Sequence, residues 1–416
     1  MRVRYVTMAF PAPYETFACS DVRALMRAGV SVSVHALRPA RPDAAQLLDE
    51  QQLGHLTLDH NSVRATLRGI VYGLRRPLVL GRLLGWLGRL LWRQPGQLLR
   101  SVVLAPRALD LLASMSSDRP DVVHLFWGHY PAIVGYLVNR NLPDVVLSVF
   151  LGAYDLEWHY EPSAPVARRA DVVWTHARAN IPVLERLGVH PSRIQLCHRG
   201  LEVERFASQH TGKVAGRVIA VGRLAGEKTM ADVLAAFARV FQRRPEATLL
   251  ILGDGPERAY LESLATNLGI RGPVTFMGRV VQDVVRDELA RAEVLLYLAR
   301  SKTDRLPNVI KEAMASRCLC VVTRTQGIDE LLLDGVHGFI VEPGDVATAA
   351  AKADWALANR GPAMVLAEAA KEHVHAHFDV NRSMGIYAHR WAELARKRAA
   401  LIVGERGRSV LSIADQ

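Results

Sequence analysis

Two pairs of charged residues in the second half of the sequence have types and spacings that suit a phosphorylated sugar. The first pair is Arg223 and Lys228 in "VGRLAGEKTM", where an apolar run ends and a helical pattern begins. Two cations beside a helix N-terminus suit a diphosphate, because the side chains supply charge and the free backbone N–H groups supply donors. On this stretch alone, two surface cations near a turn are an equally good explanation.

The second pair is Asp304 and Glu312 in "TDRLPNVIKEAM". This segment predicts a polar loop and then a helix with Pro307 at its first position, where a missing N–H costs nothing. Asp304 and exposed helix amides could hold sugar hydroxyls and phosphate oxygens, and Glu312 on the second turn could accept from a ribose hydroxyl. Acids are common near helix starts for electrostatic reasons, so the spacing alone does not exclude coincidence.

The elements that must position these residues follow an alternating pattern. Short apolar runs alternate with helical patterns, which indicates α/β layers with mainly parallel sheets. The first half predicts a helix over 15–29 and strands in "VRYVTM", "VSVSVHAL", "VVHLF", "VVLSVFLG", "DVVWTHA" and "IQLCHRG". The second half predicts helices over 230–244 and 257–268 and strands in "GRVIAVGRL", "ATLLILGDG", "VTFMG", "AEVLLYLA", "CLCVVT" and "GFIVEP". In doubly wound sheets, ligands bind at the carboxyl ends of the strands.

Length and composition set the broad class. A chain of 416 residues predicts two domains, which we place at 1–205 and 206–378, followed by a C-terminal helix and tail over 379–416. Half of the residues are hydrophobic and 22% are charged, which excludes a disordered chain. Four scattered cysteines without a C-x-x-C pair exclude a disulfide framework and favour a reducing cytoplasm. The start of the chain predicts a buried strand rather than a signal peptide, and no apolar stretch reaches membrane-spanning length.

A basic segment interrupts the first domain over about 60–115. Residues 60–109 contain nine arginines and no Asp or Glu, and the net charge of the chain is +11. At roughly 100° per residue, the arginines 82, 89 and 93 share one helical face, opposite the leucines 84, 87 and 91. Such a basic helix, accompanied by Trp86 and Trp92, suits an anionic membrane surface through Arg82, Arg89 and Arg93. A helical insertion packed on the first sheet with a solvated arginine face explains the pattern equally well.

Taken together, several segments resemble a known family. "VGRLAGEK", "LLILGDGPE", "VTFMGRV" and "LPNVIKEAMA" recur in this order in retaining glycosyltransferases of family 4, including enzymes of surface polysaccharide synthesis. The resemblance is specific over 217–344, looser in "FPAPYETF" and "CHRGLEVERF", and least in the basic insertion. It implies the GT-B fold: two doubly wound Rossmann-like domains facing an interdomain cleft, with the C-terminal helix returning to the N-terminal domain.

The resemblance also implies roles for matching positions. Arg223 and Lys228 would neutralise the leaving diphosphate of a nucleotide-sugar. Asp304 would contact the donor sugar, and Glu312 the ribose. Further donor-binding positions would be Gly222, Arg279, Val280, Leu306, Pro307, Asn308 and Val309. Acceptor-side positions would be Glu15, Thr16, His124, Tyr154 and Asp155. The family implies a metal-independent reaction with no cofactor besides the nucleotide-sugar substrate, and no enzymic nucleophile is assigned.

Some positions depart from the family pattern. The first motif acid is Asp304 rather than Glu, Arg305 replaces a glycine, and Leu151 takes the place of a histidine. Phe126 stands where relatives often have a second histidine. The pair His373 and His377 could ligate a metal, but a helix surface is the favoured interpretation because no third ligand is evident. "GDGPER" lacks the third glycine of a dinucleotide fingerprint, which argues against a dehydrogenase.

These observations leave several functions open. The leading hypothesis is a retaining glycosyltransferase that acts on a saccharide acceptor, lipid-linked, at the cytoplasmic face of the membrane. The departures at 151, 304 and 305 also fit a weakened or non-catalytic subunit that binds nucleotide-sugar or a partner enzyme. An epimerase of the same fold would act on the nucleotide-sugar without an acceptor. Nucleic-acid binding is disfavoured because no recognition module surrounds the arginines.

Overall fold

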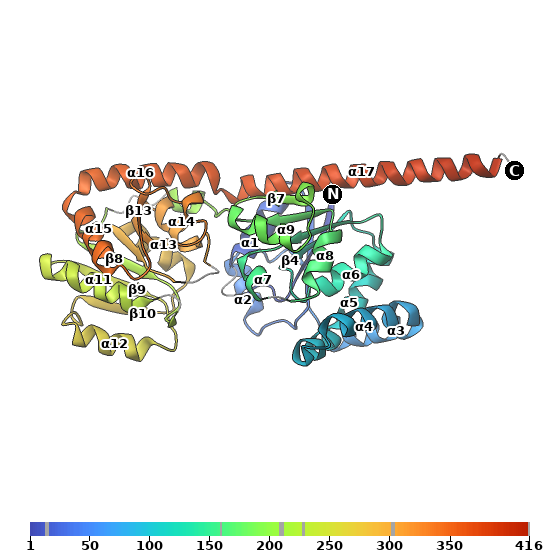
Figure 1. The fold of residues 1–416 in the computed structure, drawn as a ribbon, viewed down its shortest axis with the longest axis horizontal. Helices are drawn as coiled ribbons and strands as arrows, with labels where there is room; N and C mark the ends of the chain where they lie inside the picture. The colour runs from blue at the N-terminus through green and yellow to red at the C-terminus, as the bar shows by residue number, and fades with distance from the viewer. Residues whose placement is uncertain (13–15, 159, 208–211, 227–228, 301–303, 415–416) are drawn as a thin grey trace. The chain divides into compact units, whose positions relative to one another are not determined.

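The chain forms two parallel-sheet units, shown in Figure 1. This computed structural model describes residues 1–416 apart from 13–15, 159, 208–211, 227–228, 301–303 and 415–416. Unit 1 contains residues 1–176, 180–197 and 381–416, and unit 2 contains 177–179 and 198–380. The second unit therefore begins at His198 and ends at Val380, whereas the sequence-based boundaries are 206 and 378.

Unit 1 is built on a seven-stranded parallel sheet with the order β3-β2-β1-β4-β5-β6-β7. The strand order changes direction at β1. The strands β2 and β3 lie on one side of β1, and β4 lies on its other side, where Val3 pairs with Val122. All residues of β4 and β5 are buried, as expected for parallel strands covered on both faces. The strands are β1 (Arg2–Thr7), β2 (Ser31–Ala36), β3 (Thr57–Asp59), β4 (Val122–Phe126), β5 (Val146–Phe150), β6 (Val172–Thr175) and β7 (Ile194–Leu196).

The helices of unit 1 include the predicted first crossover helix, which begins at Thr16 and ends at Arg27 (α1). The others before residue 200 are α2 (Ala44–Glu50), α3 (Val63–Arg75), α4 (Pro77–Leu91), α5 (Pro95–Ser117), α6 (Ala132–Asn141), α7 (Ala153–Trp158), α8 (Ser163–Arg169) and α9 (Ile181–Arg186). The helix α4 ends at Leu91, and Pro95 opens α5.

The basic insertion is the helical layer α3 to α5, and α3 packs on α5 through glycines. A Cβ at Gly69 would lie 1.7 Å from the carbonyl oxygen of Pro106, so the two backbones touch there. Of the three leucines expected opposite the arginines on α4, Leu87 and Leu91 are buried, whereas Leu84 is 38% exposed. Leu83 is buried in its place, because the buried stripe runs at a spacing of four residues along α4.

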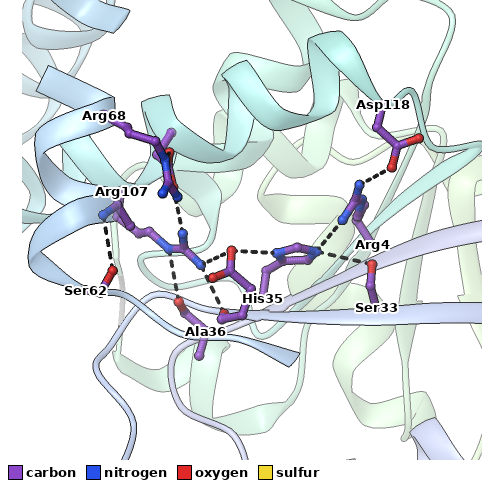
Figure 2. A network of polar contacts seen from close by, with 11 residues as sticks. Arg4, Ser33, His35, Ala36, Ser62, Arg68, Arg107 and Asp118 are labelled. Carbon is purple, nitrogen blue, oxygen red and sulfur yellow. Dashed lines mark hydrogen bonds and ion pairs between the residues drawn. The ribbon is translucent and has the colours of Figure 1, made fainter. Parts of the chain in front are cut away.

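A buried polar network anchors this layer to the sheet (Figure 2). Arg107 of α5 is fully buried and donates to Asp110 (2.8 Å) and to the carboxylate of Asp59 at the end of β3 (2.9 Å). Arg68 of α3 donates to the other oxygen of Asp110 (2.7 Å). His35 of β2 places Nδ1 3.4 Å from Asp59. Burial alone would raise the pKa of Asp59, but its contacts with His35 and Arg107 lower that pKa below its usual range.

The C-terminal helix α17 (Val380–Ala414) belongs to unit 1, so its predicted return to the N-terminal domain is confirmed. Tyr387 stacks on Trp174 of β6 with ring centroids 3.7 Å apart. Trp391, which has no exposed surface, donates Nε1 to the hydroxyl of Ser148 in β5 (2.9 Å). The helix therefore completes the core of the sheet from a distant part of the sequence.

Unit 2 contains a six-stranded parallel sheet with the order β10-β9-β8-β11-β12-β13. All six strands lie within the predicted runs. They are β8 (Arg217–Val221), β9 (Thr248–Leu252), β10 (Val274–Gly278), β11 (Val294–Tyr297), β12 (Leu319–Thr323) and β13 (Gly338–Val341). The helices are α10 (Glu204–Ala207), α11 (Met230–Arg243), α12 (Arg258–Asn267), α13 (Gln282–Arg291), α14 (Asn308–Ala315), α15 (Val346–Ala358) and α16 (Arg360–His377). Among the described residues, no helix combines the length and apolar character needed to cross a bilayer.

Candidate functional site

The candidate donor site lies where the strand order of unit 2 changes direction. The first strand of the unit, β8, is flanked by β9 on one side and β11 on the other. In open α/β sheets the crevice for ligands forms at the carboxyl ends of the two strands on either side of this reversal. The loop that leaves β8 carries Arg223, and the chain that leaves β11 carries Asp304 and then Glu312 in α14, so the topology directs these residues to one edge of the sheet.

Close backbone packing shapes the loop after β8. A Cβ at Gly253 would lie 1.9 Å from the carbonyl oxygen of Gly222, and Gly253 has a φ of +141° that glycine tolerates. The amide of Leu224 donates to the carbonyl of Asp254 (3.1 Å). Arg223 lies between these contacts and its side chain is exposed. The other predicted cation, Lys228, lies outside the described residues.

Thr229 marks the start of the next helix with an unusual backbone. It is the N-cap residue of α11 with φ 41° and ψ 48°, in the left-handed region. Its buried hydroxyl has no hydrogen-bond partner among the described residues. A non-glycine residue in this region costs on the order of 1–3 kcal/mol, and such strain clusters at binding sites. This position was not singled out from the sequence, because local composition gives no sign of a left-handed threonine.

Asp304 is oriented by a tyrosine at the end of β11. Tyr297 donates its hydroxyl to Oδ2 of Asp304 (2.7 Å). The neighbouring Arg305 is 2% exposed, and Leu306 is 5% exposed. The side chain of Arg305, which replaces the glycine of the family pattern, is therefore buried.

The start of α14 differs by one position from the prediction. Pro307 is the N-cap residue, and Asn308 is the first residue of the helix. The buried ammonium of Lys311 donates to the side-chain oxygen of Asn308 (3.1 Å) and to the carbonyl of Arg199 (2.8 Å). The side chain of Asn308 is thus held in place, and the partly buried Val309 follows it.

Glu312 meets the helix that follows β10. Gln282, the first residue of α13, donates Nε2 to Oε1 of Glu312 (2.8 Å). Burial raises the pKa of Glu312 to about 7, against a smaller opposite effect of that hydrogen bond. The exposed Arg279 and the partly buried Val280 directly precede α13, so the predicted positions 279, 280 and 312 belong to one neighbourhood. Gln282 itself was missed, because nothing in the sequence pairs it with a residue thirty positions later.

On the acceptor side, His124 is a correction. It lies in the middle of β4, is 2% exposed, and packs against the rings of Tyr387 and Trp391. The hydroxyl of Ser148 accepts from both Trp174 (3.0 Å) and Trp391 (2.9 Å), so its hydrogen is left to donate to Nδ1 of His124 (2.9 Å). His124 is therefore a core residue rather than an acceptor contact.

Asp155 also differs from the expected contact role. Its two oxygens accept from the amides of Gly128 (2.8 Å) and Gly152 (2.9 Å), which follow β4 and β5. The side chain is buried and positions both loops. Thr16 is the first residue of α1, and Glu15 lies outside the described residues. Leu151 is also buried.

An exposed aromatic pair stands beside Asp155 at the carboxyl end of β5. Tyr154 is 46% exposed and Trp158 is 63% exposed, and their rings stack with centroids 5.3 Å apart. The ring of His129 lies 5.4 Å from Tyr154. Trp127, with φ 74°, adds a left-handed residue after β4. The sequence analysis predicted Tyr154 but not the residues at 127, 129 and 158. These aromatic residues lie close to "WG" and "LG", where two strands end, and that position could have indicated them.

The metal alternative at His373 and His377 gains no support from geometry. His373 and His377 lie one turn apart on α16 with ring centroids 4.8 Å apart. Within the described part of the chain, no three His, Cys, Asp or Glu side chains are grouped so that they could hold a metal ion. Asp155 and Glu157 share α7, but the carboxylate of Asp155 is used by two backbone amides.

Comparison with known proteins identifies the region that contains the donor site. Residues 204–373 match the family described as glycosyl transferases group 1. We call this matched region the group 1 domain. This domain includes Arg223, Asp304 and Glu312 and corresponds closely to unit 2.

Two curated relatives are similar to the group 1 domain and its surroundings. The N-acetyl-alpha-D-glucosaminyl L-malate synthase of Bacillus anthracis is 34% identical over 38% of this chain and 41% of its own length. The lipopolysaccharide core biosynthesis glycosyltransferase LpsE of Rhizobium meliloti is 32% identical over 52% of this chain and 66% of its own length. The alignments thus span less than two thirds of these relatives.

Solved structures extend the likeness to both units. The crystal structure of Anabaena Alr3699/HepE in complex with UDP matches with a TM-score of 0.72 and 16% sequence identity. The match covers 94% of this chain and 100% of that chain. Together with the two parallel-sheet units, this confirms the predicted Rossmann-like GT-B fold class. The interdomain cleft remains a prediction.

Proposed function

We propose that this protein is a retaining, metal-independent glycosyltransferase of family 4 that moves a sugar from a nucleotide-diphospho-sugar to a saccharide acceptor. The observation that carries the proposal is the placement of Arg223, Asp304 and Glu312 on loops and a helix at the strand-order reversal of the group 1 domain. The functions of relatives support it, since LpsE acts in lipopolysaccharide core biosynthesis. A structural neighbour was solved with UDP-glucose.

In the proposed mechanism, charge stabilisation and positioning supply most of the rate. Arg223 and Lys228 neutralise the negative charge that develops on the departing nucleotide diphosphate. Glu312 accepts from a ribose hydroxyl, and Asp304, held by Tyr297, fixes the hydroxyls of the donor sugar. Main-chain groups of 306–309 face the sugar and phosphates, and those of Arg279 and Val280 lie near the base. We assign no enzymic nucleophile, metal or cofactor.

The acceptor side of the proposal centres on unit 1. Exposed aromatic rings suit the apolar faces of sugars, and the stacked Tyr154 and Trp158 offer such a surface at the carboxyl end of β5. Asp155 acts through the two loops that it positions rather than by touching the acceptor. The departures in sequence favour one alternative, a weakened glycosyltransferase-like subunit that binds nucleotide-sugar or a partner enzyme. The buried Leu151, where relatives have a histidine, is the observation in its favour.

Titration calorimetry with nucleoside diphosphates tests the donor site. Wild-type protein should bind a nucleoside diphosphate, and Arg223→Ala with Lys228→Ala should weaken binding by about 100-fold, since each charge-assisted contact contributes roughly 1.5 kcal/mol or more. An unchanged affinity would show that Arg223 and Lys228 do not bind the diphosphate. Turnover by the purified chain with a matching donor and acceptor would exclude the non-catalytic alternative, and a product formed without acceptor would indicate an epimerase.

We further propose that the enzyme works at the inner face of the cell membrane on a lipid-linked acceptor. The helical layer α3 to α5 supports this location through what we call the apolar ridge: Val63, Leu67, Ile70, Val71, Leu74, Leu78, Trp92, Leu99, Val102 and Val103, all exposed. On α3, the small residues Ala65, Gly69 and Gly73 are buried, so the ridge residues lie on its outer side. The arginines 82, 89 and 93 on and after α4 are also exposed. Apolar side chains flanked by cations suit an anionic bilayer.

Vesicle sedimentation tests this location. The protein should bind phosphatidylglycerol vesicles at low salt and release them as salt rises. Leu67→Glu with Leu74→Glu should abolish binding, and Arg82→Ala, Arg89→Ala and Arg93→Ala together should weaken it. Val365→Glu on α16, which changes a side chain that is 69% exposed, is the matched control and should bind normally. If the protein does not associate with the vesicles at low salt, the helical layer α3 to α5 has a structural role only.

A further inference from the structure

A pocket on unit 1 is lined by arginines that no described residue neutralises. It is a cavity of about 300 Å³ between α4, α6 and α8, lined by Trp86, Tyr136, Asn139, Arg140, Arg168 and Arg169 together with apolar groups. The lining contains no acidic residue. Its size is at the lower end of small-molecule sites, roughly 300–1,000 Å³, and suits a headgroup rather than a whole lipid.

The positive charge of this pocket is not balanced by its own lining. Some arginines of unit 1 do pair with an acid, as Arg68 and Arg107 do with Asp110. Among the described residues, Arg140, Arg168 and Arg169 form no ion pair. Arg168 donates Nε to the carbonyl of Leu187 (2.6 Å), which fixes its guanidinium at the pocket. Three cations without a carboxylate create a region of positive potential that attracts an anion.

An aromatic wall gives the pocket a second chemical feature. The rings of Trp86 and Tyr136 stack with centroids 4.1 Å apart and planes 13° apart. The guanidinium of Arg140 lies 5.3 Å from the centroid of Tyr136, and the hydroxyl of Tyr136 donates to the carbonyl of Arg82 (3.1 Å). These contacts hold the wall rigid, so it can pack against the carbon part of a ligand while the arginines hold the charged part.

The same face of α4 continues the positive surface. Arg82, Arg89 and Arg93 lie four residues before and three and seven residues after Trp86, so helical periodicity places them on its side of the helix. All three are exposed. Asn139 and Arg140 end α6, and Arg168 and Arg169 end α8. In an α/β unit the helix after a strand runs back to the amino edge of the sheet, so this pocket is at the edge opposite Tyr154 and Asp155.

We propose that this pocket is a binding site for the phosphoryl group of an organic phosphate ester, carried either by an anionic lipid headgroup or by a soluble phosphate ester. Arg140, Arg168 and Arg169 bind the phosphoryl oxygens, and the Trp86–Tyr136 wall packs against the adjoining carbon atoms. The competing explanation is that these arginines only stabilise the ends of α6 and α8, where cations favour the helix dipole. The inference does not depend on the proposed glycosyl transfer.

Two measurements on the full chain test the site. The first is calorimetry with glycerol 3-phosphate, and the second is sedimentation with phosphatidylglycerol vesicles, using phosphatidylcholine vesicles as the uncharged reference. The variant Arg140→Gln with Arg169→Gln changes two exposed side chains and should fold normally. Arg38→Gln with Arg186→Gln removes the same charge from exposed positions of unit 1 outside the pocket and is the control.

The outcomes separate the two sources. If the pocket variant weakens both glycerol 3-phosphate and vesicle binding by about 30-fold, as expected for two arginines near a charged surface, and the control does not, the ligand is a lipid headgroup. If only glycerol 3-phosphate binding is lost, the ligand is a soluble ester. If both variants match the wild type, or if the control loses as much as the pocket variant, the pocket is not a phosphate site.

Discussion

At the residue scale, the candidate donor site depends on partners that distant segments supply. Asp304 and Glu312 each accept a hydrogen bond from a neutral side chain, Tyr297 and Gln282. These hydrogen bonds orient the two carboxyl groups. That the two acids bind the donor stays a prediction from the sequence. Their partners could not be predicted, because each pairing depends on how strands and helices meet.

Glu312 should make stability and ligand binding depend on pH. Its pKa is raised from 4.5 to about 7 in the folded protein, so folding favours the protonated form. Its contribution to the free energy of unfolding is therefore present below about pH 4.5 and is lost as the pH rises through 7. At 1.36 kcal/mol per pKa unit the loss is at most about 3 kcal/mol.

Chemical denaturation at several pH values measures this effect. Between pH 4.5 and 7, the free energy of unfolding of Glu312→Gln should change less with pH than that of the wild type. The nucleoside diphosphate affinity of the wild type should rise over the same range, because the carboxylate forms. Identical pH profiles for the wild type and Glu312→Gln would contradict the raised pKa.

At the element scale, the positions of strands were predicted better than the buried faces of helices. The long apolar strands could be read from composition, because buried parallel strands are apolar on both sides. The three-residue β3 at the sheet edge was missed because its sequence, "TLD", is polar at two of three positions and gives no apolar run. On α4, leucines occur on both flanks of the buried stripe, so only packing decides that Leu83 is inside and Leu84 is outside.

The loop after β8 offers a test of element packing. Gly253→Ala should destabilise the protein by about 2 kcal/mol or more, because the new Cβ meets the carbonyl of Gly222 at 1.9 Å and φ is +141°. The displaced loop should also lower nucleoside diphosphate affinity, since it carries Arg223. Thermal melting and calorimetry measure the two effects.

A matched glycine serves as the control for that variant. Gly272 has open space around the position of a Cβ, so Gly272→Ala should change stability by no more than about 0.5 kcal/mol. If both variants melt together with the wild type, the close approach of residues 222 and 253 is not tight in solution.

At the scale of the whole molecule, the two units differ in how the chain builds them. Unit 2 is almost one continuous segment, whereas unit 1 combines residues before 198 with residues after 380. The GT-B class and the return of the last helix could be anticipated from the family resemblance. The residues at which the chain passes from one unit to the other could not be anticipated, because they depend on contacts such as those of Tyr387 and Trp391 with the sheet.

Trp391→Ala should therefore act on unit 1 alone. Removing a fully buried indole costs about 3–5 kcal/mol, and the hydroxyl of Ser148 loses one of its donors. Hydrogen-exchange mass spectrometry should show faster exchange in β4, β5 and β6 and unchanged exchange in unit 2. Trp92→Ala, at a position 66% exposed, is the control and should leave both units unchanged. Equal effects of the two variants would contradict the packing of α17 in the core of unit 1.

The placement of α17 has a consequence for biosynthesis. A ribosome makes the sheet of unit 1 first, but the indole that fills it is near the end of the chain. Unit 2 is complete as soon as Val380 has left the ribosome, so it can fold while unit 1 still lacks its last helix. The nascent protein must therefore keep the apolar face of β4, β5 and β6 from aggregating until α17 has been synthesised. We expect this interval to be where molecular chaperones engage it.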